Sequence, residues 1–235
     1  MYRKGGANTG QIHGAPVGEI DLRKVKADAD GRFSFLCSQT RPEGYEGEWY
    51  AIPPVITGFL LRHFILGPEQ VEGTTTIERL DRPPMPTAPD EAETARLASV
   101  LASFVAKNNE FMLTQVLGLR DRGFVHAFDG DHFPEAGGIP EQIYFQTLFE
   151  LEEDEALILE SELPRSVYYW ACQLFDALYS GIDYVFHQSA LNCRDAVVDA
   201  DGKVRFVVSI RDPGVANWLD TAGWKSGGIM WRWHT

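Results

Sequence analysis

The stretch EQIYFQTLFELEEDEALILESELPRSVYYWACQLF, residues 141–175, decides the fold class. It holds three runs rich in β-branched and aromatic side chains, at 142–149, 155–163 and 166–175, with turns and no helical pattern between them. Strands at this spacing, joined by loops and hairpins, favour an antiparallel sandwich or barrel. The acidic clump between the first two runs is typical of a solvated turn.

Similar runs continue on both sides of this stretch. They lie at 182–190, 195–199, 204–210 and 228–234 toward the C-terminus, and at 32–38, 48–52, 55–66 and 74–80 toward the N-terminus. Asp-Ala-Asp-Gly occurs twice, at 28–31 and 199–202, and Asp-Gly between apolar runs predicts a hairpin turn. We therefore predict a mainly β chain that forms an antiparallel, jelly-roll-like β-sandwich.

One long amphipathic helix is predicted between two strand-rich halves. After Pro89 apolar side chains recur on one helical face, at Leu97, Leu101, Phe104, Phe111 and Met112. Thr87 or Asp90 would cap a helix of about 25 residues, and Asp-Arg-Gly at 121–123 would end it. We expect its apolar face to pack on the sheets. The segments 1–88, 89–140 and 141–235 would then form one compact domain.

The composition excludes two classes of partner. The chain of 235 residues carries 21 Lys and Arg against 34 Asp and Glu, a formal net charge of −13. A field of this sign repels nucleic acid and anionic membranes. The three cysteines, Cys37, Cys172 and Cys193, fit neither a disulfide framework nor a zinc site. We expect no cofactor, and as partner a small-molecule ligand, with a homo-oligomer as the alternative to a monomer.

The N-terminal sequence MYRKGGANTG lacks the apolar stretch of a secretion signal. The longest apolar run, 55–66, contains Arg62 and His63 and is too short to span a bilayer. A cytoplasmic location is therefore expected if Met1 is the natural start. If an upstream part is missing, a signal peptide could be missing with it.

Three segments follow one another from Tyr168 onward: YYWACQLFDALYSGIDYVFHQSALN (168–192), DADGKVRFVVSIRDPGVANWLDTAG (199–223) and the terminal RW (232–233). In these segments the chain resembles a bacterial family known as "domain of unknown function 1214". Earlier segments, IERLDRPP (77–84) and GFVHAFDGDHFPEAGG (123–138), are similar to longer members. The resemblance implies a jelly-roll β-sandwich that lacks its usual N-terminal part, and it implies no established reaction. Tyr169-Trp170 and Cys193-Arg194 depart from the smaller or more polar residues of many members.

His187 is the best candidate for a general acid or base, because imidazole titrates near neutrality. It opens HQSALN (187–192) at the end of a strand-like run. A nucleophilic pair with Ser189 is disfavoured, because side chains two residues apart on one strand rarely hydrogen-bond. The structural alternative is a histidine that hydrogen-bonds a loop carbonyl.

The loop RDPGVANWLDTAGW (211–224) holds a dense group of polar residues. In a functional interpretation, Asp212 or Asp220 orients His187, and Arg211 contacts an anionic or hydroxyl-rich ligand. In a structural interpretation, Asn217 and Asp220 hydrogen-bond the loop backbone while Trp218 anchors the loop in the core.

Two strand-like segments pose a choice between core packing and ligand contact: 168–175 and Trp231-Arg232-Trp233. Aromatic rings that flank an arginine suit either packing or a platform for sugar rings. We predict the substrate contacts to be Arg211, Gln173, Asn192, Asn217, Trp170, Trp231 and Arg232.

The loop 123–140 is dense in metal-ligand side chains, namely His126, Asp129, Asp131, His132 and Glu135. It lacks the HxH and HExxH spacings, so we expect a solvated acidic loop and no metal.

Three functions fit these observations. The leading hypothesis is a small-molecule enzyme that uses acid–base chemistry on a hydroxylated or carbonyl substrate, with His187, Asp212 and Asp220 as catalytic residues. The second is a non-catalytic module that binds carbohydrate or another small ligand, with Trp170, Trp218, Trp231 or Trp233 as stacking surfaces. The third is a structural or oligomerising domain.

Overall fold

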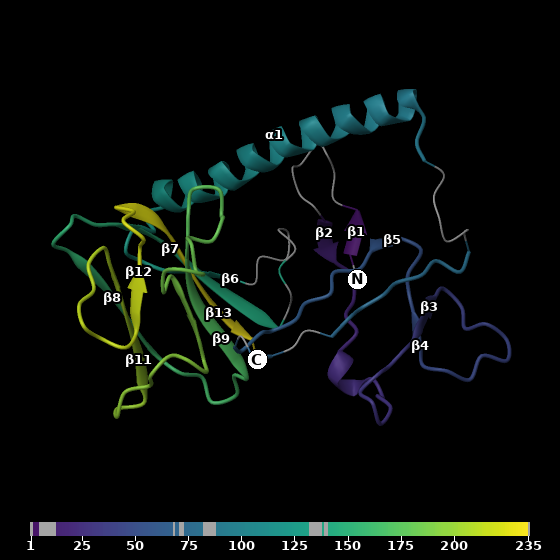
Figure 1. The fold of residues 1–235 in the computed structure, drawn as a ribbon, viewed down its shortest axis with the longest axis horizontal. Helices are drawn as coiled ribbons and strands as arrows, with labels where there is room; N and C mark the ends of the chain where they lie inside the picture. Colours follow the sequence, from purple (N-terminus) through teal and green to yellow (C-terminus); the bar gives the residue numbers. More distant parts are fainter. Residues whose placement is uncertain are drawn as a thin grey trace.

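The computed structural model of the chain describes residues 2–4, 13–67, 69–70, 73–81, 88–131, 138 and 141–234. Strands and one long helix make up the fold, which confirms the mainly β class (Figure 1). Before the helix lie β1 (Tyr2–Lys4), β2 (His13–Pro16), the 3-10 helix η1 (Leu22–Lys24), β3 (Leu36–Ser38), β4 (Trp49–Ala51) and β5 (Ile56–Gly58). Then follow α1 (Glu91–Asp121), β6 (Asp129–Asp131), β7 (Gln142–Glu150), β8 (Ala156–Glu162), β9 (Tyr169–Phe175), β10 (Ala190–Asn192), β11 (Lys203–Ser209), β12 (Trp218–Asp220) and β13 (Ser226–His234).

Two sheets form the C-terminal half. The larger sheet has the strand order β10-β9-β13-β7-β6, and the smaller has the order β12-β11-β8 (Figure 1). β13 pairs antiparallel with β7 along its whole length and with β9 on its other side. β11 pairs antiparallel with β8 and parallel with β12. The described strands therefore form an open two-layer sandwich and not a closed barrel.

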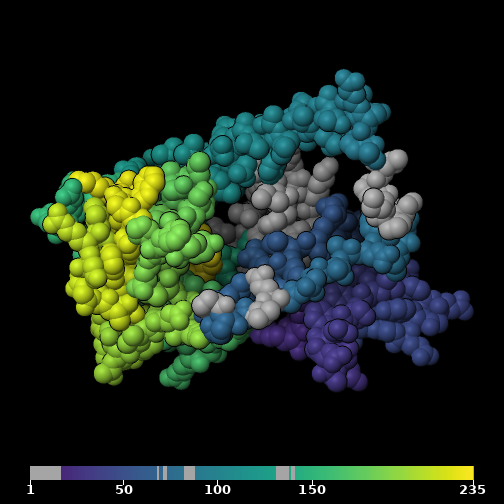
Figure 2. Space-filling view, in the orientation of Figure 1, coloured from purple at the N-terminus to yellow at the C-terminus, as the bar shows by residue number. Residues whose placement is uncertain are grey.

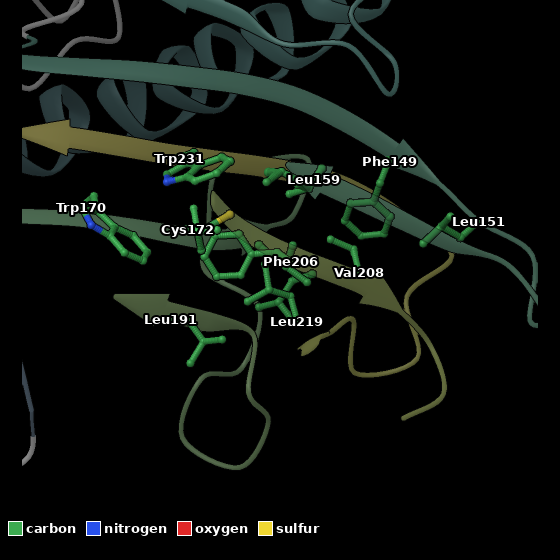
Figure 3. Close-up of a cluster of buried hydrophobic side chains, with 14 residues drawn as sticks. Phe149, Leu151, Leu159, Trp170, Cys172, Leu191, Phe206, Val208, Leu219 and Trp231 are labelled. Carbon is green, nitrogen blue, oxygen red and sulfur yellow. The ribbon is translucent and has the colours of Figure 1, made fainter. Parts of the chain in front are cut away.

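The hydrophobic core lies between these two sheets (Figure 3). Alternate side chains of β9, β11 and β13 point into it, among them Cys172, Phe206 and Trp231. Phe206, like Leu219 of β12, has no exposed surface. Burying one such side chain stabilises the fold by about 1.5–3 kcal/mol. The alternation also fixes the register, because a slip of one residue would turn every apolar side chain outward.

Helix α1 confirms the predicted helix and its start. The Asp90 carboxylate accepts a hydrogen bond from the Glu93 backbone N–H at 2.8 Å and so caps the first turn. The predicted packing of its apolar face on the sheets is only partly right. Leu119 at the C-terminal end is buried, whereas Leu101 is 62% exposed, because most of α1 extends beyond the sandwich toward the N-terminal half (Figure 1). Within the described ranges, no helix combines the length and the apolar character needed to cross a bilayer.

The strands of the N-terminal half are shorter than the predicted runs, and β1 and β2 lie outside those runs. Of the predicted runs 55–66 and 74–80, only Ile56–Gly58 forms a strand, which pairs with β1. Among the described residues before α1, only Val25 and Gly67 are buried. β-branched and aromatic composition makes a strand only where a partner strand is available, and the rest of this segment runs across other elements instead.

Two predictions for the C-terminal half also need correction. Residues 183–188, expected in a strand, form a turn, and the strand β10 begins only at Ala190. The loop 211–224 contains a strand, β12, which the sequence reading missed. The two Asp-Ala-Asp-Gly turns are confirmed: Gly31 and Gly202 have φ angles of 76° and 81°, which glycine adopts without strain.

Candidate functional site

His187 and Asp220 lie side by side at the edge of the sandwich. The Nδ1 atom of His187 is 2.7 Å from Oδ2 of Asp220. The second carboxylate oxygen of Asp220 accepts a hydrogen bond from the Ala222 backbone N–H at 2.8 Å. The histidine side chain is 41% exposed and that of Asp220 is 14% exposed. The carboxylate therefore fixes the ring orientation and leaves the Nε2 edge toward solvent.

Hydrogen bonds tie this pair to the loop that precedes β10. The backbone N–H of Asp220 donates to the Gln188 carbonyl at 2.9 Å, and the Gln188 side chain donates to the Trp218 carbonyl at 2.6 Å. Ser189 is buried and its hydroxyl donates to the Ile182 carbonyl at 2.6 Å. This hydroxyl is engaged in the structure, in agreement with the argument against a serine nucleophile.

Arg211, Asp212 and Asn217 do not join His187, which corrects the predicted site. Asp212 accepts a hydrogen bond from the Gly214 N–H at 2.7 Å and so shapes the Pro-Gly turn. The Arg211 side chain is 72% exposed and pairs with Glu153 at 3.1 Å. Asn217 is buried and serves the backbone: it binds both the N–H and the carbonyl of Val197 at 2.7 Å, and the carbonyl of Arg205. The structural interpretation of this loop is the right one at these three positions.

Trp170 and Trp231 are core residues and not stacking surfaces. They are 4% and 2% exposed and pack around Phe206, as Figure 3 shows. The indole N–H of Trp218 donates to the Ser209 carbonyl at 3.1 Å. The ring of Trp233 packs edge-on against Trp231. A platform for sugar rings built from these tryptophans is therefore wrong: Trp170, Trp231 and Trp233 lie on the inward face of the larger sheet, and Trp218, on the other sheet, is held by its bond to Ser209.

Gln173, Asn192 and Arg232 lie together on the opposite, outward face of the larger sheet. Arg232 is paired across the strands with Tyr144 on one side and Ala171 on the other, and Ala171 is paired with Asn192. We call this surface the arginine face. It comprises Gln142, Tyr144, Gln146, Tyr169, Ala171, Gln173, Ala190, Asn192, Met230, Arg232 and His234.

Arg232 is the central cation of the arginine face. Its Nε atom lies 3.0 Å from the Met230 sulfur, and its Nη1 atom lies 3.5 Å from Oε1 of Gln173, so both contacts are weak. Among the described residues, no carboxylate lies within 4.0 Å of the guanidinium. Burial lowers the pKa of Arg232, and the nearby charge of Arg62 acts in the same direction. The guanidinium is therefore desolvated without a compensating acid.

Residues 62–66 cross the arginine face from Tyr144 on β7 to Asn192 on β10. The Arg62 guanidinium donates to the Tyr144 hydroxyl at 3.1 Å, and the Leu66 carbonyl accepts from the Asn192 side chain at 3.0 Å. The ring of Phe64 lies 4.7 Å from the rings of both Tyr169 and His234. We call residues 62–66 the covering segment. The surface is hollowed beneath α1, between the sandwich and the N-terminal half (Figure 2).

The sequence reading missed the covering segment. Its one local signal is the pair Arg62-His63 inside the apolar run 55–66, where a charge has no place in a buried strand. The contacts it makes join distant residues, such as Leu66 and Asn192, which are 126 positions apart, and no local pattern reports them.

In the loop 123–140, the metal-ligand candidates His126 and Asp129 have structural partners, and Asp131 ends the strand β6. His126 Nε2 accepts a hydrogen bond from the Glu150 N–H at 3.0 Å, and Asp129 pairs with Arg122 at 2.7 Å. His132 and Glu135 lie outside the described residues. In the part of the chain that is described, His, Cys, Asp and Glu side chains form no group that could hold a metal ion.

Comparison with known proteins gives structural relatives. No family model and no curated protein matches the chain. The crystal structure of an uncharacterized protein from Burkholderia cenocepacia matches 99% of this chain with 26% identity and a TM-score of 0.81, and the chain spans 64% of that protein. The VPA0106 protein from Vibrio parahaemolyticus matches over 64% of this chain and 43% of its own, with 15% identity and a TM-score of 0.36. The chain is thus similar in fold to the Burkholderia protein, whose description states no activity.

Proposed function

We propose that this protein binds a small polar molecule on the arginine face. One observation carries the proposal: the outward face of the larger sheet is polar and yet buried. Gln142, Gln146 and His234 are 1%, 7% and 5% exposed. In an ordinary sandwich the outward face is polar because water covers it. A face that is polar and shielded from water is typical of a ligand site, where a few polar groups fix the ligand.

The outward face of the smaller sheet can be compared with the arginine face. Its outward face is the ordinary kind: Ile158 is 64% exposed, and Arg205 pairs with Glu160, Asp199 and Asp201. On the arginine face the Gln146 amide oxygen accepts a hydrogen bond from the Tyr179 hydroxyl at 2.5 Å, whereas Nδ1 of His234 is buried and has no hydrogen-bond partner among the described residues. A buried polar atom in this state costs free energy that a ligand could recover.

The test is a thermal-shift screen with small sugars, amides, amines, carboxylates and phosphates. We compare the wild-type protein with Ala171→Phe, which places a ring beside Arg232, and with Val207→Phe, which places the same ring on the outward face of β11. At least one class should raise the melting temperature of the wild type and of Val207→Phe but not of Ala171→Phe. No shift with any class, or equal shifts in all three proteins, contradicts the proposal.

The His187–Asp220 pair supports a second candidate, the acid–base enzyme. An imidazole whose Nδ1 is held at 2.7 Å by a carboxylate, with its other edge toward solvent, is the arrangement of a general base. The substrate would be a carbonyl compound that loses a proton to Nε2. Asp220 would be a positioning residue that stabilises the imidazolium.

Deuterium incorporation from heavy water into a panel of small ketones, aldehydes and keto acids tests this candidate. Catalysed exchange should disappear in His187→Gln and fall in Asp220→Asn. Exchange in both variants at the wild-type rate, or no catalysed exchange by the wild type, would remove His187 from the catalytic residues.

Family membership, the course of the strands, self-association and location are also proposals. We infer membership of the "domain of unknown function 1214" family and a jelly-roll course of the strands, supported by the motifs at 168–192 and 199–223 and by the two-layer C-terminal half. Self-association and a cytoplasmic location are likewise proposals, and light scattering and cell fractionation test them.

A further inference from the structure

We infer that the ligand of the arginine face is a small organic oxyanion, anchored by its carboxylate on the guanidinium of Arg232. This inference rests on the proposed function and narrows it to one chemical class. Three observations carry it: the charge balance of the face, the free edge of the guanidinium, and the aromatic rings at its border.

The charge balance favours an anion. Arg62 lies close enough to Arg232 for its charge to lower the pKa of Arg232. Asp129 and Asp131 of β6 share this face by register, and Asp129 pairs with Arg122 at 2.7 Å. A buried cation normally has an acidic partner, because the desolvation of an unpaired charge is costly. Here the described part of the chain provides none within ion-pair distance. A bound anion would supply the missing charge.

The orientation of Arg232 favours a carboxylate. Its Nε edge faces the Met230 sulfur and its Nη1 atom approaches the Gln173 amide oxygen. Nη2 donates no hydrogen bond to a described residue and Nη1 makes only a long one, so both terminal amino groups keep hydrogen-bonding capacity. Two parallel N–H donors on a planar guanidinium match the two oxygens of a carboxylate. The amide N–H of Gln173 is a neutral donor beside them.

The aromatic border favours an organic acid over an inorganic anion. Phe64 lies 4.7 Å from the ring of Tyr169, which is two residue pairs along the strands from Arg232 and on the same face. Ala171, the strand partner of Arg232, has a small side chain, so space beside the guanidinium is limited by the rings and not by Ala171. An apolar or aromatic body attached to the carboxylate would pack against these rings.

Isothermal titration with matched probes tests the inference. The carboxylates are acetate, succinate, benzoate and citrate; benzamide is the neutral copy of benzoate, and inorganic phosphate is the alternative oxyanion. The variants are Arg232→Met, Arg232→Lys, and Arg205→Met as the control on the other sheet. We expect at least one organic carboxylate to bind the wild type and Arg205→Met more tightly than benzamide or phosphate. Arg232→Met should bind it about ten- to a hundredfold more weakly, the value of one charge-assisted contact.

The affinity of Arg232→Lys should lie between those of the wild type and Arg232→Met, because lysine keeps the charge and loses the pair of parallel N–H donors. Benzamide that binds as tightly as benzoate, with Ala171→Phe abolishing both, would leave ligand binding on the arginine face intact and overturn the oxyanion. Phosphate that binds more tightly than every carboxylate would overturn the carboxylate anchor. Equal affinities of wild type and Arg232→Met would remove Arg232 from the site. No binding of any probe at millimolar concentration would overturn this inference, and binding of a neutral compound in the wider screen would then keep the proposed function.

Discussion

Replacing Arg232 by methionine should make the ligand-free protein more stable. Most substitutions at half-buried positions destabilise a protein, so a gain in stability is unusual. It is expected here because the positive charge of Arg232 has no acidic partner among the described residues. Methionine keeps a long flexible chain that packs where the aliphatic part of arginine packs, and it removes the desolvated guanidinium. The weak contacts that are lost, to Met230 and Gln173, leave no strong acceptor without a donor.

The size of the effect follows from the burial of Arg232. Replacing buried charges with apolar side chains of similar volume stabilises other proteins by about 1–4 kcal/mol, and a half-buried group should give the lower part of that range, about 1–2 kcal/mol. In a chain of this size 1 kcal/mol corresponds to roughly 2–4 °C, so the melting temperature should rise by roughly 2–8 °C.

The assay is urea unfolding, followed by tryptophan fluorescence, on wild type, Arg232→Met and Arg205→Met. Arg205 lies on the outward face of the other sheet and pairs with three carboxylates, so its replacement should lower the unfolding midpoint or leave it unchanged. An Arg232→Met midpoint at or below that of the wild type would refute the reasoning, because Arg232 would then have a stabilising partner in solution.

Three further predictions concern stability. Asn217→Ala should lower the unfolding free energy by about 2–4 kcal/mol, because it leaves buried backbone groups unpaired, and a loss below 1 kcal/mol in urea unfolding would contradict this. Phe206→Ala should lower the free energy of unfolding by about 3–5 kcal/mol. Phe186 is 85% exposed, so Phe186→Ala should change it by no more than about 0.5 kcal/mol. Similar losses in the two variants would place the core elsewhere. Burial lowers the pKa of His234 below 6.5, so the unfolded chain binds more protons and stability should fall as the pH drops below 6.5. In His234→Gln the melting temperature should depend less steeply on pH over this range. An unchanged pH dependence in the variant would contradict the prediction.

Alternation of side chains was enough to predict most of the C-terminal sandwich. β7, β8, β9, β11 and β13 all lie within predicted runs or within two residues of them, because each has an apolar side chain at every second position toward the core. β12 was missed, since its three residues pair parallel with β11 inside a loop rich in turn residues. The run 182–190 has strand composition, yet Asp183 caps a turn by accepting from the N–H groups of Val185 and Phe186.

The candidate site was only partly accessible to the same reasoning. Gln173 stood out because a polar side chain in an apolar strand is hard to explain as core, and it does lie on the outward face beside Arg232. Trp170 and Trp231 looked equally suitable, but the sequence does not say which face of a strand the core takes. The pairing of His187 with Asp220 joins residues 33 positions apart and depends on how the 183–188 turn meets β12.

We infer that the N-terminal half completes the proposed binding site on the arginine face. It buries almost nothing of its own among the described residues, so it has little core to hold it in place. What it contributes is the covering segment, whose Arg62, Phe64 and Leu66 each contact a residue of the arginine face. The covering segment contacts Tyr144, the cross-strand partner of Arg232, and its Arg62 adds a second positive charge close to Arg232. Docking of the covering segment and binding of an anion should therefore favour each other, since the ligand restores the charge balance that the cover disturbs.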